Sequence, residues 1–514
     1  MIDVLTGLIP IIPVLGAFTV PIVYLALRNR VIVMSIGAVA TFISLVISVL
    51  LVLETYSRDM PIVFKAGGWP APIGIIYIAD RFTATLSLVT CFVGFLINLY
   101  SISYITDENY PWYTALLLGC LSGILGIVLT GDLFNLFVML EVTSVSAYGL
   151  VMYYRFRANS VISGLKYAFI GALGTTLYLL AMGLVYSTFE TLNIVDFSLK
   201  IREISSPVVI QVFPVVMVLA LWTFSIKSGV FPNHFWLPDA HPAAPTPISA
   251  LLSGLVVNTG EIALYKLLYL ATWSTLENPL PKPLEEVKYI ISLMTTYMGA
   301  ISAITGALLM YIQRDVKRLI AYSTIMNLGY LFMAIGCGTR RGIEAALLYT
   351  SVHSVAKAAL FLSTGVFIKA VKSRSLEKLA GSWRASRVAA VTLALSILTL
   401  AGVPPLPGFL AKLILYNALF EYSIPLAILM IIASAIGLVS YMKLFYTILL
   451  APLSSSIVRV DMKLAKLVLV ILATTVLVAG LLFTTMLQLL FTILNNVSEQ
   501  VVNIELYIVS VFPR

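Results

Sequence analysis

A single charged residue, Lys227, interrupts the apolar stretch Val215-Val-Met-Val-Leu-Ala-Leu-Trp-Thr-Phe-Ser-Ile-Lys-Ser-Gly-Val230. Burying a charge in a bilayer costs several kcal/mol by most estimates. Ionisable residues nevertheless recur inside other apolar stretches, at Glu141, Lys166, His353, Lys357 and Lys412. Repeated burial of this kind is typical of membrane proteins that move ions or protons, so we interpret the chain as a cation conductor.

The composition supports a membrane protein. Hydrophobic residues make up 60% of the chain and charged residues 11%, and the mean hydropathy is +1.02. An average soluble domain has about 25% charged residues. Apolar runs recur from Val4 to the region before Val497, and about fourteen of them are long enough to cross a membrane as helices. We therefore predict an all-α polytopic membrane protein.

Basic residues mark every second loop between the predicted helices. The clusters are Arg28 with Arg30, Arg155 with Arg157, Arg314 to Arg318, Lys369 to Arg387, and Arg459 to Lys466. The positive-inside rule places such loops in the cytoplasm and therefore predicts that both termini lie outside. Arg340 and Arg341 are exceptions, because their loop would be external. The formal net charge of +9 follows mostly from these loops and requires no nucleic-acid partner.

Two predicted helices contain a lysine beside helix-breaking residues. Lys227 precedes Gly229 and Pro232, and Lys412 follows the cluster Pro404, Pro405, Pro407 and Gly408. Proline interrupts a helix, and paired broken helices in two halves indicate a transporter built of inverted repeats. We divide the chain into three N-terminal helices with an external, hairpin-like loop from Glu54 to Asp80 (1–105), two five-helix repeats (110–272 and 286–450), and a fourteenth helix with a tail (460–514).

No cofactor is expected from the sequence. The three cysteines, Cys91, Cys120 and Cys337, lie far apart, without a C-x-x-C spacing. His234, Asp239 and His241 could hold a metal ion, but their loose spacing between prolines fits the entrance of a half-channel, or a helix cap near Thr246, better. The sequence has no nucleotide-binding loop or flavin fingerprint, so an energy source would have to come from partner subunits.

Several long motifs, in order, resemble one family of membrane proteins. They are Lys227-Ser-Gly-Val-Phe-Pro-Asn-His-Phe-Trp-Leu-Pro-Asp-Ala-His-Pro-Ala-Ala-Pro-Thr-Pro247, Gly131-Asp-Leu-Phe-Asn-Leu-Phe-Val-Met-Leu-Glu141, Gly164-Leu-Lys166-Tyr-Ala-Phe, Asp315-Val-Lys-Arg-Leu-Ile-Ala-Tyr-Ser323 and Leu400-Ala-Gly-Val-Pro-Pro-Leu-Pro-Gly-Phe-Leu-Ala-Lys412. Over about residues 65 to 450 the chain is similar to the antiporter-like subunits of respiratory complex I, Mrp sodium/proton antiporters and energy-converting membrane-bound hydrogenases. The stretch Gly67 to Ile75 with Asp80-Arg81 looks like the D-type Mrp protein and its archaeal counterparts.

The resemblance implies roles for Glu141 and Lys227. In the family, the glutamate of the fifth helix modulates the lysine of the seventh, which passes a proton along a hydrated path. The physical argument agrees, because a nearby carboxylate keeps a buried lysine charged and its withdrawal favours proton release. We therefore predict that Glu141 and Lys227 make contact. A static ion pair that fixes helix packing is the alternative.

Tyr349, His353 and Lys357 are spaced i, i+4, i+8, so one helix face carries a polar stripe that Thr364 extends. Such a row can hold water and suits a proton relay between the halves, and it resembles the family's central lysine with a histidine one turn earlier. Alternatively, His353 is a core histidine that donates to a carbonyl. Lys412 resembles the terminal lysine that hands protons to the far side, with snorkelling to a membrane surface as its alternative.

One position departs from the family. Many relatives carry a lysine on the eighth helix where Asn258 stands here, and Glu261 is the nearest ionisable group. Asparagine can order a water wire but cannot store charge, so we expect water to bridge the halves at Asn258. Glu261 would then face a polar helix or pair with Lys266. The segment Asp315 to Arg318 reads as an ordinary cytoplasmic anchor in which Asp315 caps a helix.

These observations predict a proton-translocating, antiporter-like subunit of a redox-driven complex in the plasma membrane. Its partners would be the lipid bilayer and other membrane subunits, including further antiporter-like and small hydrophobic ones. The transported ion is a proton, alone or with sodium. The alternatives are the D-type subunit of an Mrp sodium/proton antiporter and a structural anchor with an inactive channel. The intact set Glu141, Lys227, Lys357 and Lys412 argues against the anchor, because an inert scaffold gains nothing from buried charges.

Overall fold

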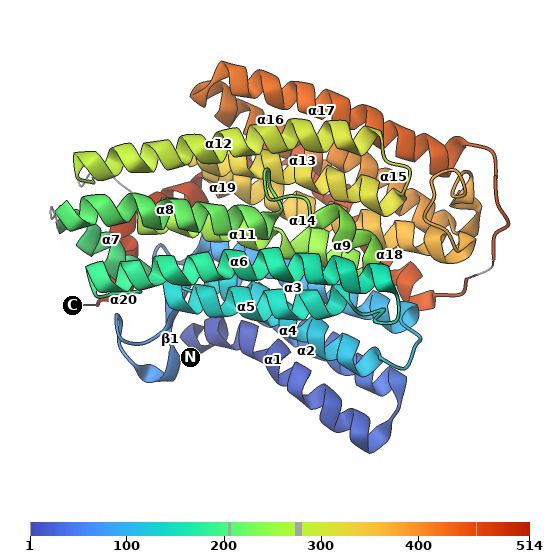
Figure 1. The fold of residues 1–514 in the computed structure, drawn as a ribbon, viewed down its shortest axis with the longest axis horizontal. Helices are drawn as coiled ribbons and strands as arrows, with labels where there is room; N and C mark the ends of the chain where they lie inside the picture. Colours follow the sequence, from blue (N-terminus) through green and yellow to red (C-terminus); the bar gives the residue numbers. More distant parts are fainter. Residues whose placement is uncertain (1, 204–206, 273–279, 459, 514) are drawn as a thin grey trace.

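The computed structural model describes residues 2–203, 207–272, 280–458 and 460–513, and most of these form long helices that lie side by side (Figure 1). Within these ranges, 13 helices are long and apolar enough to cross a membrane. The remaining predicted span is present as two shorter helices, Arg387–Ala401 and Pro407–Tyr422, separated by the predicted break. The prediction of an all-α polytopic membrane protein is confirmed.

The elements follow one another in this order. The N-terminal part has α1 (Ile2–Leu27), α2 (Arg30–Ser57), β1 (Ile62–Lys65), a 3-10 turn (Ala66–Gly68), β2 (Ile76–Ala79) and α3 (Arg81–Tyr104). The next part has α4 (Tyr110–Leu129), α5 (Leu133–Val151), α6 (Ala158–Phe189), α7 (Ile194–Glu203), α8 (Pro207–Ser228), α9 (Leu237–Ala243), α10 (Thr246–Leu251), a π-helical segment (Leu252–Val256), α11 (Asn258–Tyr265) and a second π-helical segment (Lys266–Ala271).

The rest of the chain continues the bundle. It has α12 (Lys282–Tyr311), α13 (Val316–Gly336), α14 (Arg340–Val371), a 3-10 turn (Ser382–Ala385), α15 (Arg387–Ala401), α16 (Pro407–Tyr422), α17 (Ile424–Phe445), a π-helical segment (Tyr446–Leu450), α18 (Lys463–Thr485), α19 (Leu487–Val502) and α20 (Ile504–Val511).

The loop between α2 and α3 is a short hairpin, as predicted. Strands β1 and β2 pair antiparallel, with Ile62 opposite Ala79 and Lys65 opposite Ile76. Gly67 and Gly68 adopt positive φ angles of 66° and 76° at the turn, which glycine tolerates because it lacks a Cβ atom.

The first predicted helix break follows α8. The helix ends at Ser228, Gly229 has a φ of +63°, and the chain resumes as helix only at Leu237. Side chains satisfy the freed backbone groups: Ser302 Oγ accepts from the Phe231 amide at 2.8 Å, and the Trp236 indole donates to the Ile226 carbonyl at 3.0 Å. Irregular backbone at membrane depth needs such partners, because lipid offers none.

The continuous segment Thr246–Ala271 forms the centre of the bundle and is buried along its whole length. It begins at the end of α9, and α13 and α14 pack against it (Figure 1). Helices α1, α2 and α18 lie further out, with no more than 33% of the residues in their most apolar windows buried. This arrangement places the ionisable residues of α8, α11 and α14 around one buried core.

Several of the basic loops meet at one end of the bundle. Arg30 donates to the carbonyls of Ile102 and Ile105 at the end of α3, and Lys369 donates to the Tyr104 carbonyl at 3.1 Å. Arg157, Arg318 and Arg374 line a common cleft at this end. We call it the basic end of the bundle. Arg459, from the last predicted basic cluster, lies outside the described residues.

Candidate functional site: a series of buried lysines

Lys227 lies in the last turn of α8 and is buried. Its Nζ donates to Ser144 Oγ on α5 at 2.6 Å and to the Gly171 carbonyl on α6 at 3.3 Å. The lysine stands at the break because Gly229 and Pro232 end the helix directly after it. Three helices therefore meet at one ammonium group.

The expected direct contact between Glu141 and Lys227 is not formed. Among the described residues, Glu141 makes no ion pair within 4 Å, and its side chain is only partly buried. Lys227 instead bonds Ser144, which lies one turn further along the same face of α5. Glu141 stays within electrostatic range of the lysine. Ser144 is buried, whereas Glu141 is only partly buried.

Asn258 and Glu261 link α11 to α14. Asn258 Nδ2 donates to Ser354 Oγ and to the Gly254 carbonyl, both at 2.9 Å, and Thr350 Oγ1 donates to Glu261 Oε1 at 2.6 Å. Asn258 Oδ1 and Glu261 Oε2 have no hydrogen-bond partner among the described residues. Glu261 thus faces a polar helix, which is one of the two predicted outcomes. The other, a pair with Lys266, is wrong, because Lys266 Nζ donates to the Thr130 carbonyl at 2.7 Å.

The predicted polar stripe on α14 is buried throughout. Tyr349 donates to Asn327 Oδ1 at 2.6 Å, and Lys357 donates to Ser323 Oγ and to the Ile320 carbonyl on α13. His353 stacks on Tyr349 with ring centroids 6.4 Å apart. Neither of its ring nitrogens has a hydrogen-bond partner within the described ranges, so the alternative of a histidine donating to a carbonyl is not what the structure shows.

Lys412 lies in α16, near the second break. It is buried, and its Nζ donates to Ser434 Oγ at 2.8 Å and to the Ala401 carbonyl at 3.2 Å. The ammonium group also sits 5.6 Å from the centroid of the Tyr330 ring. Burial excludes the snorkelling alternative.

The three lysines share one pattern of partners. Lys227, Lys357 and Lys412 each donate to one serine hydroxyl and one backbone carbonyl, and none forms an ion pair in the part of the chain that the structure describes. Neutral acceptors stabilise an ammonium group less than a carboxylate does, so they bind a charged lysine without fixing its charge. This is the property that a proton carrier needs.

Sequence reasoning misses most of these partners. Ser144 and Ser434 carry no signal of their own, because serines are common in apolar helices. Ser323 lies inside a quoted motif, at the end of the stretch that starts at Asp315, but the motif alone gives it no role.

The remaining predicted residues surround the break and a cleft at the basic end. The prediction that Lys166 lies in an apolar interior is wrong, because its side chain is 54% exposed and pairs with Asp239 at 3.0 Å. Asp239 also pairs with Arg318 at 3.2 Å. His234 is partly buried beside Phe231, and His241 is fully buried with its ring stacked on Phe361 at 4.9 Å. Lys166 is exposed because α6 borders the cleft and is not enclosed by other helices.

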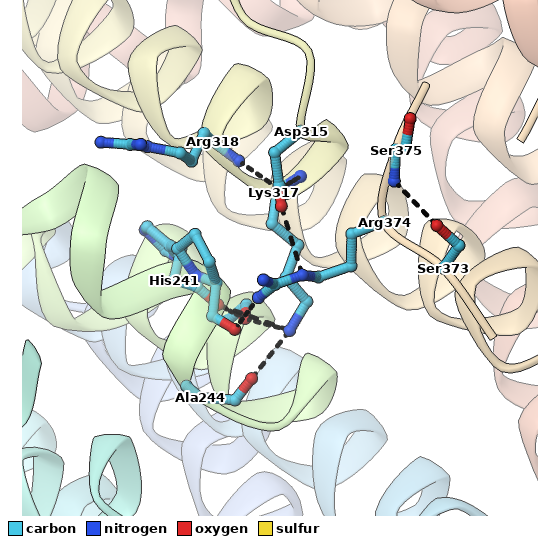
Figure 2. A network of polar contacts seen from close by, with 10 residues as sticks. His241, Ala244, Asp315, Lys317, Arg318, Ser373, Arg374 and Ser375 are labelled. Carbon is cyan, nitrogen blue, oxygen red and sulfur yellow. Dashed lines mark hydrogen bonds and ion pairs between the residues drawn. The ribbon is translucent and has the colours of Figure 1, made fainter. Parts of the chain in front are cut away.

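Lys317 is another buried lysine, and the sequence did not single it out. Asp315 caps α13 as predicted, accepting from the amides of Lys317 and Arg318. Lys317 does not behave as a surface anchor, however: its Nζ donates to the Ala244 carbonyl at 2.8 Å, to Ser249 Oγ at 3.1 Å and to the His241 carbonyl at 3.4 Å (Figure 2). It therefore ties the start of α13 to the end of α9.

Comparison with known proteins identifies the family. Residues 130–437 match the protein-family model described as NADH:quinone oxidoreductase/Mrp antiporter, TM. Residues 65–114 match a second family model, described as NADH-Ubiquinone oxidoreductase (complex I), chain 5 N-terminus. The chain belongs to this NADH:quinone oxidoreductase/Mrp antiporter family.

Individual relatives agree. The D-type subunit of the Na(+)/H(+) antiporter of Alkalihalophilus pseudofirmus is 30% identical over 485 residues, which is 91% of this chain and 92% of that relative. A chain from the membrane-bound sulfane sulfur reductase, an archaeal respiratory membrane complex, superposes with a TM-score of 0.89 at 26% identity, covering 99% of both chains. A chain of the Mrp complex from Dietzia sp. DQ12-45-1b has the same fold, with a TM-score of 0.85 at 22% identity and 99% coverage of both.

Proposed function

We propose that this protein translocates protons, or protons together with sodium, as an antiporter-like subunit of a larger membrane complex. The observation that carries the proposal is the series of buried lysines, Lys227, Lys357 and Lys412, each bonded to a serine and a carbonyl and none to a carboxylate among the described residues. Intramembrane ionisable residues of this kind mark ion pathways.

The charge of Glu141 would act on Lys227 electrostatically, without a fixed ion pair, while Ser144 holds the ammonium group. A static pair would hold the lysine charged, whereas a carboxylate that approaches and withdraws changes the lysine's proton affinity. His353 and Lys357, with Tyr349 nearby, would relay protons to Lys412. The unpartnered oxygens of Asn258 and Glu261 are suitable for ordered water between the halves.

With repeats at 110–272 and 286–450, Lys227 would belong to the first repeat, near its break, and Lys357 and Lys412 to the second, with Lys412 near the second break. With the basic end facing the cytoplasm, both termini would lie on the outer side of the plasma membrane. Residues 1–105 and 460–514 would flank the two repeats.

Two kinds of complex fit this protein. A redox-driven respiratory complex is favoured by the likeness to a chain of the archaeal sulfane sulfur reductase. An Mrp-type sodium/proton antiporter is favoured by the 30% identity to a D-type antiporter protein over nearly the whole chain. In both cases the partners would be other membrane subunits.

Affinity purification of the tagged full-length chain from its native membrane distinguishes these two kinds of complex. Copurifying subunits with iron–sulfur or nickel–iron centres, detected by their absorption and metal content, identify a redox-driven pump. Only small hydrophobic subunits without metal identify the Mrp type. A chain recovered without partner subunits contradicts the proposal in both forms.

A further inference from the structure

The structure contains a large cleft at the basic end of the bundle, with a volume of about 970 Å³. It lies between α6, α9, the start of α13 and the segment that follows α14. Two carboxylates, Asp239 and Asp315, face six cationic side chains, which are Arg157, Lys166, Lys317, Arg318, Lys372 and Arg374. The formal charge of these side chains is therefore +4, from six cations and two carboxylates.

Both carboxylates are already engaged. Asp239 is shared by Lys166 and Arg318, and Asp315 pairs with Arg374 at 3.2 Å while its other oxygen caps α13. Figure 2 shows the pairing of Asp315 with Arg374 and the position of Arg374 beside the His241 segment.

Three cations of the cleft, Arg157, Lys317 and Lys372, have no acidic partner within the described ranges, and Lys317 among them is held by two carbonyls and Ser249. Arg157 only stacks on the Tyr154 ring at 4.5 Å, and Lys372 forms no ion pair. The cleft thus holds unneutralised positive charge, which favours an anionic ligand.

One wall of the cleft continues as an apolar stripe. Ile162 lines the cleft and is 52% exposed, and Leu165, Phe169 and Leu173 follow it on the same face of α6, also exposed. A small soluble anion would gain nothing from this stripe. A molecule with an anionic head and hydrocarbon chains would contact both surfaces.

We propose that the cleft binds the phosphate headgroup of an anionic phospholipid, with its acyl chains along α6. Basic pockets between membrane helices on the cytoplasmic side bind acidic headgroups in this way. Arg157 and Lys372 contact the phosphate, and Ile162, Leu165 and Phe169 contact the first chain segments. The proposal concerns a bound lipid and does not depend on the transport proposed above.

The test uses the purified full-length protein in a neutral detergent, titrated with short-chain phosphatidylglycerol or phosphatidylcholine and followed by native mass spectrometry. The variants are Arg157→Gln and Lys372→Gln. Arg155→Gln is the matched control, because Arg155 lies in the same loop but does not line the cleft. Phosphatidylglycerol is expected to bind more tightly than phosphatidylcholine. Each cleft variant should raise the apparent Kd for phosphatidylglycerol about fivefold, which is the effect of one basic residue on an anionic lipid.

Four results would overturn the proposal. The first is equal binding of the two lipids, and the second is equal weakening by Arg155→Gln and Arg157→Gln. The third is complete competition by millimolar inorganic phosphate, which would make the ligand a free anion. If one cleft variant fails to fold, the other variant and the phosphate competition on the unchanged protein still decide. An acidic segment of a copurifying protein, crosslinked into the cleft and displacing the lipid, would also contradict it.

Discussion

Lys227 donates a 2.6 Å hydrogen bond to Ser144, so its partner on α5 is a hydroxyl one turn away from the carboxylate of Glu141. A hydroxyl positions the ammonium group without adding a charge. The carboxylate can then change the lysine's proton affinity through a change in its distance or in its own charge, which makes the pair a candidate switch and not a fixed structural bridge.

Ser144→Ala tests this arrangement. The variant removes the hydroxyl that accepts the shorter hydrogen bond of Lys227 and leaves only the Gly171 carbonyl, at 3.3 Å. A hydrogen bond to a charged group contributes about 1.5–3 kcal/mol, so ion flux into vesicles should fall roughly tenfold or more. Ser146→Ala is the control, because Ser146 lies on the same helix and accepts no hydrogen bond from Lys227. Equal flux in Ser144→Ala and the unchanged protein would contradict the role of this hydroxyl.

Asn258→Leu tests the connection between the halves. Leucine has a similar size but can neither donate to Ser354 nor hold water, so it should reduce flux to a small fraction of the wild-type rate. The control is Thr259→Val, since the Thr259 hydroxyl bonds only within its own helix, to Val256. Unchanged flux in Asn258→Leu would mean that the two lysine centres operate separately.

The sequence predicted the burial of Lys227, Lys357 and Lys412, where two helices break, the hairpin, the Asp315 cap and the polar face of α14, but it wrongly placed Lys166 in the interior. These features depend on local composition and helical spacing. The partners of the lysines could not be predicted, because they depend on how neighbouring helices are rotated and shifted against each other. Ser144, Ser323 and Ser434 acquire their roles only when α5, α13 and α17 pack against the lysine-bearing helices. For the same reason the sequence could not show that Lys266 lies away from Glu261 or that Lys317 is buried.

Lys317→Met tests a structural role. The change leaves the buried Ala244 carbonyl without its donor, while the His241 carbonyl still accepts from Ser249 Oγ, and an unsatisfied buried polar group costs about 1–3 kcal/mol. We expect a lower Tm in detergent, measured by intrinsic fluorescence. Lys466→Met, at an exposed position near the start of α18, should leave the Tm unchanged. A wild-type Tm for Lys317→Met would show that the α9–α13 contact does not depend on this lysine.

The central claim is that the buried lysines carry protons, and proton flux through single-lysine variants tests it most directly. The purified complex is reconstituted in vesicles containing a pH-sensitive dye, and flux is started by a sodium or potassium-diffusion gradient. Lys227→Ala and Lys357→Ala should each abolish flux, while assembly with the copurifying subunits stays intact, because removing a buried charge leaves an apolar bundle. Lys466→Ala should transport at the wild-type rate. Wild-type flux in either Lys227→Ala or Lys357→Ala, with normal assembly, would contradict the account.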